Sequence, residues 1–187
     1  MKNLFDIKDK VVVITGGTGV LGKAIAFHLA EEGAKVVILG RKAEIGDAIA
    51  GEIKANGGEA MFLTTDVMNR ELLEQNLADI LKAYGRIDAL LNAAGGNMPG
   101  ATIAPTGTFF DLKIEEFQRV LELNLTGSTA YTSLPQTDGG AEGRCYCQLL
   151  QHGCFPPHDA CSRICCRKSR YLQFHSLHGY GSCQEVW

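Results

Sequence analysis

Apolar residues between positions 10 and 125 follow two patterns that alternate along the chain. Four short, nearly continuous apolar runs are typical of strands buried on both faces: residues 11–14, 35–39, 60–63 and 87–91. Between and after these runs, apolar residues recur at three- and four-residue spacings. This spacing predicts helices at residues 20–32, 43–55, 69–84 and 114–125. Strict alternation of strand and helix predicts an α/β fold with a parallel sheet covered by helices on both faces.

The same spacing predicts which side chains of the helices face the core. The residues expected there on the first, third and fourth helices are, in that order, Leu21, Ile25 and Leu29; Leu72, Leu73, Leu77, Ile80 and Leu81; and Phe117, Val120, Leu121 and Leu125. Gly33 follows the first helix, as expected of a residue that ends a helix.

A glycine-rich turn joins the first predicted strand to the first predicted helix. Gly17, Gly19 and Gly22 form the pattern G-x-G-x-x-G directly after the strand. Glycines in this position let a pyrophosphate approach the backbone, and the free N–H groups of the helix start attract its charge. The turn therefore predicts dinucleotide binding in a Rossmann-like, doubly wound sheet. The residues expected at the cofactor are Thr15, Gly16, Gly17, Thr18, Gly19, Leu21 and Gly22.

Two alternatives to this interpretation are a plain glycine-rich turn and a phosphate-binding P-loop. The P-loop fits Gly17, Gly22 and Lys23 but requires a Ser or Thr hydroxyl for Mg²⁺ at the next position, which is Ala24. The P-loop is therefore strongly disfavoured.

Charge at the end of the second predicted strand bears on the choice of cofactor. An acid there favours NAD through the adenosine ribose, whereas an arginine accommodates the 2′-phosphate of NADP. This strand is followed by Gly40, Arg41 and Lys42 and by no acid. We therefore expect NAD(P) binding with a preference for NADP; the alternative is a solvated pair of cations.

Four motifs in order resemble the short-chain dehydrogenase/reductase family across residues 8–127. They are Thr15–Gly22, Asp66-Val67 after the third strand, Asn92-Ala93-Ala94-Gly95 after the fourth, and Asn124-Leu125-Thr126-Gly127 in the fourth helix. The sequence departs from the family in one place, because Val20 stands where the second glycine is usual.

The resemblance implies roles for several residues. Asp66, with Val67, would contact adenine, and residues 92–95 would line the cofactor. Asn124 would be the active-site asparagine, which holds a water in a proton relay. The simpler alternatives are turn capping for Asp66 and Asn92, and a helix hydrogen bond for Asn124.

Residues 92–102 resemble one branch of this family, the fructuronate reductase or D-mannonate oxidoreductase type. That resemblance implies hydride transfer between NAD(P) and a secondary alcohol or ketone of a small sugar acid, to which Gly96 and Asn97 would present polar groups. The alternative is an ordinary loop between strand and helix. Intact relatives of the family are homo-oligomers.

The last 60 residues differ in composition from the rest of the chain. All 7 cysteines lie after position 144, and four of the five histidines lie after position 151. The family requires a fifth strand ending in a catalytic Ser and then a Tyr-x-x-x-Lys helix, whose tyrosine is the general acid/base. None of these is present, so we expect a fold truncated after the fourth strand and fourth helix, an uncovered edge at the fourth strand and an inactive chain.

A shift of reading frame accounts for this tail. Read one base out of frame, the codons across residues 146–153 permit I-V-N-x-S-S-M, and those across residues 163–169 permit G-Y-A-A-A-K. Both resemble the missing family motifs and occur in the family's order. We therefore divide the chain into residues 1–127, the nucleotide-binding half, and residues 128–187, an out-of-frame tail expected to be disordered or poorly packed.

A metal-binding tail is the competing interpretation, which makes the protein a non-catalytic dinucleotide-binding protein. The cysteines and histidines suffice for zinc, but no C-x2-C pair occurs and the spacing matches no familiar zinc module. We therefore predict no metal site. A disulfide framework is less favoured still, because the first segment resembles cytosolic proteins.

Composition excludes several other classes of protein. The net charge of −3 and the absence of a Lys/Arg run argue against nucleic-acid binding. No apolar run approaches the roughly 18 residues of a membrane span. The first ten residues lack the apolar core of a signal peptide, so we expect a cytoplasmic protein with a small-molecule substrate.

Overall fold

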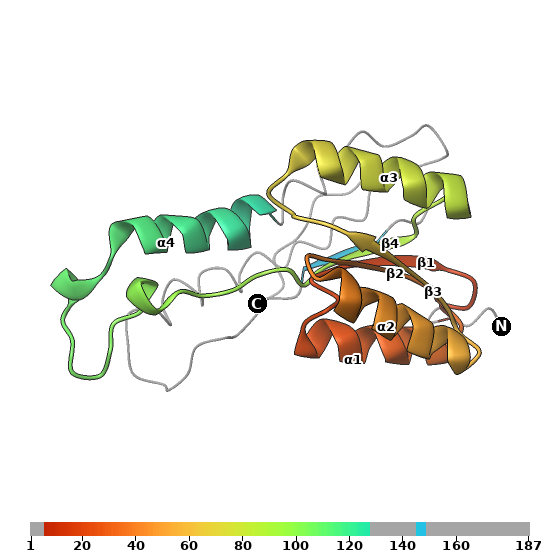
Figure 1. Cartoon of the computed structure of the whole chain (residues 1–187), viewed down its shortest axis with the longest axis horizontal. Helices are drawn as coiled ribbons and strands as arrows, with labels where there is room; N and C mark the ends of the chain where they lie inside the picture. The colour runs from red at the N-terminus through yellow and green to blue at the C-terminus, as the bar shows by residue number, and fades with distance from the viewer. Residues whose placement is uncertain (1–5, 128–144, 149–187) are drawn as a thin grey trace, which may run out of the picture.

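The computed structural model describes residues 6–127 and 145–148 of the chain (Figure 1). Strands and helices alternate as the sequence predicts. Their bounds are β1 Val11–Thr15, α1 Val20–Glu31, β2 Lys35–Gly40, α2 Ala43–Ala55, β3 Glu59–Thr64, α3 Arg70–Tyr84, β4 Ala89–Asn92, η1 Pro99–Ala101, η2 Phe109–Asp111, α4 Ile114–Leu121, η3 Glu122–Thr126 and β5 Cys145–Gln148. The segments η1 and η2 are 3-10 turns, and η3 is a π-helix that continues α4.

The five strands form one parallel sheet in the order β3-β2-β1-β4-β5. The chain runs outward from β1 to β3 and then crosses back to β4 on the other side of β1. Figure 1 shows α1 and α2 on one face of the sheet and α3 on the opposite face. The α/β, doubly wound parallel fold is therefore confirmed.

Strand β5 corrects the expectation that the sheet ends at β4. The segment pairs with β4 in parallel, from Ala89 opposite Cys145 to Asn92 opposite Gln148. The prediction of an uncovered edge at β4 is therefore wrong. The physical reason is that pairing uses the main-chain N–H and C=O groups of an extended segment, which side-chain patterns alone do not reveal.

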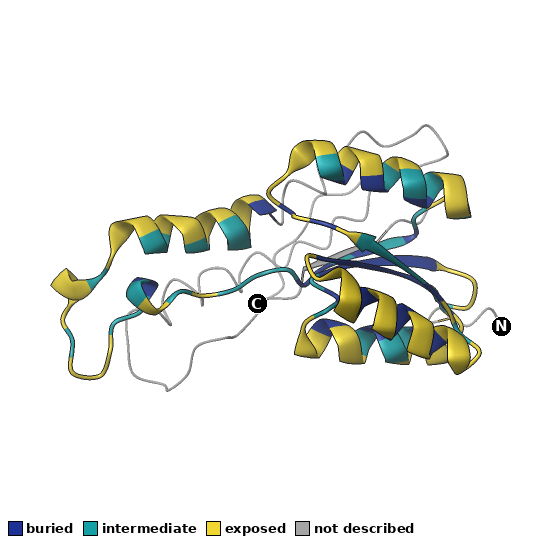
Figure 2. Ribbon diagram, viewed as in Figure 1, coloured by how far each residue is buried: buried dark blue, intermediate teal, exposed yellow. Residues whose placement is uncertain are grey.

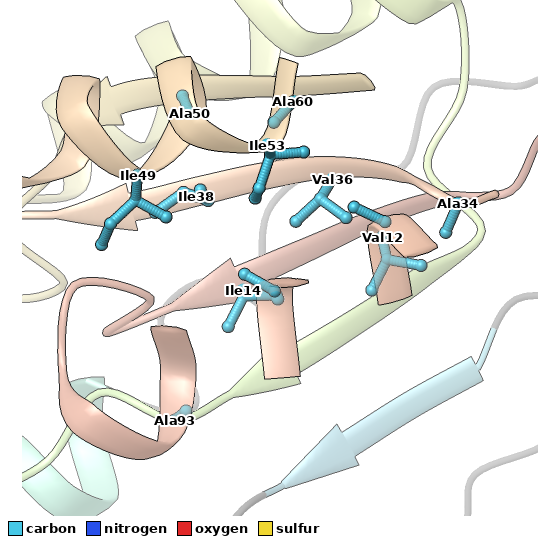
Figure 3. Close-up of a cluster of buried hydrophobic side chains, with 12 residues drawn as sticks. Val12, Ile14, Ala34, Val36, Ile38, Ile49, Ala50, Ile53, Ala60 and Ala93 are labelled. Atoms are coloured by element: carbon cyan, nitrogen blue, oxygen red, sulfur yellow. The ribbon is translucent and has the colours of Figure 1, made fainter. Parts of the chain in front are cut away.

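Two hydrophobic clusters lie on opposite faces of the sheet. Val12 and Ile14 point to the face of α1 and α2, where Figure 3 shows them with Ile38, Ile49 and Ile53. The alternate residues of β1 and β2 point to the opposite face, where they pack with α3: Val11, Val13, Val37, Leu39, Leu73 and Ile80. A strand buried on both faces explains why β1 is a continuous run of β-branched residues.

Helix α1 meets the sheet through smaller residues than the spacing of its leucines predicts. Its buried residues are Gly22, Ala26 and Ala30, whereas Leu21 is 56% exposed. Glycine and alanine bring the helix axis close to the strands, so the longer side chains flank the contact. The expectation that Leu21 faces the core is therefore wrong.

Helix α4 also departs from its predicted orientation. Phe117 and Val120 are half-buried, but Leu121 and Leu125 are 36% and 52% exposed. Figure 2 shows most of α4 exposed, in contrast to the strands of the sheet. The prediction that Leu121 and Leu125 are buried is wrong, because spacing identifies an apolar stripe and does not identify what covers it.

Two glycines of α2 have opposite surroundings, which allows a paired stability test. A Cβ at Gly46 would overlap the Phe62 ring, whereas a Cβ at Gly51 would meet nothing within 4 Å. We expect Gly46→Ala to lower the free energy of unfolding by about 1–3 kcal/mol through overpacking. Gly51→Ala should raise it by about 0.5–1 kcal/mol, because alanine favours a helix more than glycine does. Urea denaturation of both variants measures the two values; a destabilised Gly51→Ala would contradict the packing described for α2.

Candidate functional site

A cleft opens at the carboxyl ends of the strands, where the direction of strand order reverses between β1 and β4. In doubly wound sheets ligands bind at this switch point. The cleft has a volume of about 180 Å³ and is lined by Gly16, Thr18, Gly19, Leu39, Gly40, Arg41, Thr65, Asp66, Val67, Ala93, Ala94, Gly95 and Leu123. These residues lie at or just after the ends of β1, β2, β3 and β4 or belong to η3, so five segments that are separate in sequence meet here.

The turn after β1 requires glycine at two positions for different reasons. Gly16 has a φ of 67°, and a Cβ there would lie 2.7 Å from the backbone of Ala94. A Cβ at Gly22 would collide with the carbonyl oxygen of Gly16. The turn is thus packed against β4's exit loop and against α1 with no room for side chains.

The amino end of α1 is suited to an anion. The helix begins after Gly19, its first turn carries no acidic residue, and Gly19 itself lies on the cleft. Unpaired N–H groups and the helix dipole favour negative charge at such an end. A cradle that side chains would fill, next to this helix end, fits the pyrophosphate of a dinucleotide.

The hydroxyl of Thr15 joins β1 to the segment after β4. Its Oγ1 accepts hydrogen bonds from the backbone N–H groups of Ala93 and Ala94, both at 3.1 Å. Thr15 is 1% exposed, so it lies beneath the cleft and does not line it. We conclude that Thr15 shapes the site from below by fixing the backbone of the β4 exit.

Arg41, the cation predicted to influence cofactor choice, directly follows β2. Arg41 is exposed and lies on the cleft. The preceding residue, Gly40, is buried, and a Cβ there would lie 2.7 Å from both the methyl and the hydroxyl of Thr18. The side chain of Thr18 therefore takes the space above Gly40, where the chain leaves β2.

The segment after β3 contributes a wall of mixed polarity. Asp66 is exposed, and its Oδ1 accepts a hydrogen bond from the Met68 N–H at 2.9 Å, which makes it a turn-capping residue as well as a cleft residue. Val67 is 7% exposed and supplies an apolar surface beside it. Thr65 is held from α3, because Asn76 Nδ2 donates to Thr65 Oγ1 at 2.7 Å.

Asn124 lies in η3 and holds the loop after β4 at Gly96. Its Nδ2 donates to the Gly96 carbonyl at 2.7 Å and to the Val120 carbonyl at 2.8 Å, and its Oδ1 accepts from the Gly96 N–H at 3.3 Å. The hydrogen bond expected within the helix is therefore present, and a second contact fixes the loop beside the cleft. Asn124 does not itself line the cleft, whereas its neighbour Leu123 does.

A second contact from α4 fixes the same loop further along. Glu116 accepts a hydrogen bond from the Gly100 N–H at 2.7 Å, and the Gly100 carbonyl accepts one from the Lys113 N–H at 2.8 Å. A Cβ at Gly100 would lie 2.7 Å from the Glu116 carboxylate, which explains the glycine. The loop after β4 is thus attached to α4 at both Gly96 and Gly100.

Asp111 caps the turn that precedes α4. The Thr108 backbone N–H and hydroxyl donate to its carboxylate at 2.7 and 2.9 Å, and these hydrogen bonds hold the pKa of Asp111 below its ordinary value. This carboxylate lies outside the cleft and orients the connection into α4.

The structure sorts the residues predicted to bind the cofactor into three groups. Those on the cleft are Gly16, Thr18, Gly19, Arg41, Asp66, Val67, Ala93, Ala94 and Gly95. Those buried beneath or beside it are Thr15, Gly17, Gly22 and Asn92. Leu21 is exposed on α1 and does not line the cleft.

Sequence reasoning missed four cleft residues: Leu39, Gly40, Thr65 and Leu123. Thr65 directly precedes Asp66, and Leu123 directly precedes Asn124, so each was one position from a recognised motif. Gly40 and Thr65 could have been predicted from their positions, because residues at the carboxyl ends of parallel strands line the binding crevice in doubly wound folds.

The chain belongs to the short chain dehydrogenase family, whose family model matches residues 10–144. This match runs past residue 127, the predicted end of the nucleotide-binding half. The chain is similar to the uncharacterized oxidoreductase UxuB of Bacillus subtilis, with 44% identity over 131 residues, 66% of this chain and 47% of the relative. It thus spans about half the length of the curated relatives it matches.

Solved structures of the family are similar to the fold described above. A crystal structure assigned as a candidate D-mannonate oxidoreductase from Haemophilus influenza, with bound NAD, has a TM-score of 0.63 and 34% identity, and the match covers 68% of this chain and 49% of that one. An actinorhodin polyketide ketoreductase with NADPH has a TM-score of 0.59 and 31% identity, covering 66% and 45%. The class of ligand shared by these structures is a nicotinamide dinucleotide.

Predictions for the tail concern residues that the structure does not describe. The out-of-frame assignment and the zinc alternative both lie there, apart from the backbone of β5. Among the side chains of residues 6–127, no group of three or more metal-ligating residues occurs. In the same part of the chain, no helix is long and apolar enough to cross a membrane.

The Thr15 hydroxyl allows a direct test of the β1–β4 connection. We expect Thr15→Val to lower the free energy of unfolding by about 1–3 kcal/mol, because valine has the same shape but accepts no hydrogen bond from Ala93 and Ala94. Thr15→Ser, the matched control, keeps the hydroxyl, so its free energy of unfolding should fall by less. Urea denaturation and hydrogen exchange at the Ala94 amide measure the effect. Equal losses in the two variants would contradict this role.

Proposed function

We propose that this chain is the nucleotide-binding half of an NADP-preferring short-chain dehydrogenase acting on a small sugar acid. The observation that carries the proposal is the cleft at the switch point, where the glycine turn, Arg41, Asp66 and the β4 exit meet. When bound, the cofactor supplies the hydride donor or acceptor.

The residues of the cleft fit the successive parts of a dinucleotide. The amino end of α1, next to Gly16 and Gly19, would hold the pyrophosphate. Asp66 and Val67 would flank the adenine with one polar and one apolar surface, and the free Oδ2 lone pairs of Asp66 remain available after its turn bond through Oδ1. Ala93, Ala94 and Gly95 would border the cofactor on the side of β4.

The preference for NADP rests on charge at the end of β2. Arg41 lies on the cleft, and the two residues before it, Leu39 and Gly40, supply no carboxylate to bind a ribose diol. A guanidinium binds a phosphate with two parallel, charge-assisted hydrogen bonds. The 2′-phosphate of NADP therefore matches this position better than the free hydroxyl of NAD does.

The sugar-acid substrate is supported by the loop after β4. Asn97 is exposed, and its Nδ2 donates to the Thr102 hydroxyl at 2.8 Å, so two hydrogen-bonding side chains stand together there. Asn124 and Glu116 fix the loop on either side of Asn97. A polar pair on the loop that follows the cleft residue Gly95 would suit a substrate with several hydroxyl groups.

The 187-residue sequence lacks the general acid/base that the family uses for catalysis. No Tyr in the sequence is followed four positions later by Lys. Without such a tyrosine, no side chain of the family's kind moves the proton at the carbonyl or hydroxyl oxygen of the substrate. We therefore propose that the chain binds cofactor and does not turn over substrate.

A frameshift near residue 128 remains our account of the missing residues. Strand β5 supports it, because residues 145–148 lie next to β4 and overlap the segment whose shifted codons permit the family's fifth strand. The same shift permits Tyr and Lys at the family's spacing.

Arg41 provides the test of cofactor choice. We expect Arg41→Ala to weaken NADPH binding roughly ten- to a hundredfold, the loss of about 1.5–3 kcal/mol for a hydrogen-bonded charge, and to leave NADH binding unchanged. Fluorescence titration with both nucleotides measures this. Arg70→Ala is the control, because Arg70 pairs with Glu74 on α3 at 2.9 Å, away from the cleft. Equal weakening of NADH and NADPH would contradict a contact with the 2′-phosphate.

Restoring the frame tests the proposed activity. The gene is expressed as it stands and with the reading frame shifted by one base near codon 128. We expect both products to bind NADPH, and only the second to oxidise it with a keto-uronate such as fructuronate. Turnover by the 187-residue chain would overturn the claim that it is inactive. DNA that encodes no Tyr-x-x-x-Lys in the shifted frame would overturn the frameshift.

A further inference from the structure

Asn76 is a polar residue on the buried face of α3. It lies three residues after Leu73 and four before Ile80, which are the other buried residues of this helix, and it is 4% exposed. The spacing favours an apolar side chain at this position, because the face packs against the sheet. A buried amide costs free energy unless it makes hydrogen bonds, so the groups that it binds indicate its role.

The amide of Asn76 binds the chain where it leaves β3. Its Nδ2 donates to the Thr64 carbonyl at 3.2 Å and to Thr65 Oγ1 at 2.7 Å. Thr65 is 3% exposed, and its hydroxyl in turn donates to the Leu63 carbonyl at 3.0 Å. These hydrogen bonds join the middle of α3 to the end of β3 and to the first residue after it.

The segment that Asn76 holds continues along the wall of the cleft. Thr65, Asp66 and Val67 line the cleft one after another. The Thr65 N–H also donates to the Gly40 carbonyl at 2.8 Å, which ties this segment to the end of β2. A constraint on Thr65 therefore reaches Asp66 along the chain and the neighbouring strand across the sheet.

The stability of the fold alone gives little reason for a polar pair at Asn76 and Thr65. Replacing both partners of a buried hydrogen bond by apolar groups of the same shape is often neutral or stabilising. A hydrogen bond adds direction, because amide and hydroxyl meet in one arrangement whereas apolar side chains pack in several. A segment held in one arrangement before a ligand arrives loses less conformational entropy when the ligand binds.

We propose that Asn76 is a positioning residue for the adenosine end of a bound nicotinamide dinucleotide, and that it acts through Thr65 to hold Asp66 and Val67 at the cleft. The proposal rests on the proposed function, because it takes this part of the cleft as the adenine site. Asn76 does not line the cleft, so its effect on the ligand passes through the residues after β3.

Asn76→Leu removes the amide with little change in volume. We expect it to weaken binding of NADPH, NADH and ADP-ribose by the same factor, roughly tenfold, which corresponds to about 1.4 kcal/mol. Isothermal titration calorimetry on the purified 187-residue chain measures the three affinities. ADP-ribose lacks the nicotinamide, so an equal loss for all three ligands places the effect at the adenosine end. Unchanged affinities overturn the proposal, and a loss confined to NADPH overturns the assignment to the adenine wall.

Substitutions of Thr65 test how the effect is transmitted. Thr65→Val should reproduce the loss of affinity, whereas Thr65→Ser keeps the hydroxyl and should bind like the unsubstituted chain. The double variant should bind no more weakly than Asn76→Leu alone, because both substitutions remove the same contact. Additive losses overturn the claim that Asn76 acts through Thr65. If Asn76→Leu does not fold, equal affinities of Thr65→Val and Thr65→Ser overturn the proposal by themselves.

Leu77→Ala is the control for a general loss of stability in α3. Leu77 is the next residue of the helix, packs against the hydrophobic cluster on this face of the sheet and does not line the cleft. This variant should lower the urea midpoint of unfolding at least as much as Asn76→Leu does, and leave the three affinities unchanged. A similar loss of affinity in Leu77→Ala overturns a specific role for Asn76.

The unsubstituted chain separates this proposal from the proposed function. If it binds none of the three ligands, the proposed function is contradicted and the positioning role is overturned with it. If it binds them and Asn76→Leu binds them equally well, the positioning role alone is overturned.

Discussion

The close approach of the β1 turn to the β4 exit is the constraint on which the site depends. Gly16 adopts a positive φ, and its Cα lies so near the backbone of Ala94 that no side chain fits between them. The Thr15 hydroxyl closes the same contact with two hydrogen bonds beneath the cleft. Because strand order reverses here, this contact brings the helix end of α1 beside the exit of β4 and creates the cleft at the switch point, where ligands bind in doubly wound sheets.

The residues around that contact divide into those that face the cleft and those that hold them. Arg41 and Asp66 present charge to the cleft, while Asn76 and Asn124 hold Thr65 and Gly96 from neighbouring helices. A binding site built on strand ends and fixed by such contacts loses little conformational entropy when a ligand binds. The cleft proposed to bind the nucleotide is therefore held by contacts from neighbouring helices, although the chain spans only about half the length of its relatives.

Sequence periodicity predicted the elements better than their orientation. The β-branched run of β1 predicted a strand buried on both faces, and the two hydrophobic clusters confirm this prediction. Leu21 and Leu125 were misplaced because an apolar stripe is defined by its spacing, whereas its burial depends on the neighbouring element. Strand β5 was missed because main-chain pairing leaves little trace in side chains.

The sequence by itself determined the α/β class, the glycine turn and the cation after β2, because each depends on residues that are close in the chain. Only the tertiary structure decided which strand ends meet. The hydrogen bond from Ala93 to Thr15 joins residues 78 positions apart, and those between Asn124 and Gly96 join residues 28 apart. Such contacts follow from strand order and helix packing, which local patterns constrain but do not specify. Leu123 and Thr65 line the cleft because strand order and helix packing place them there, which is why local patterns did not predict them.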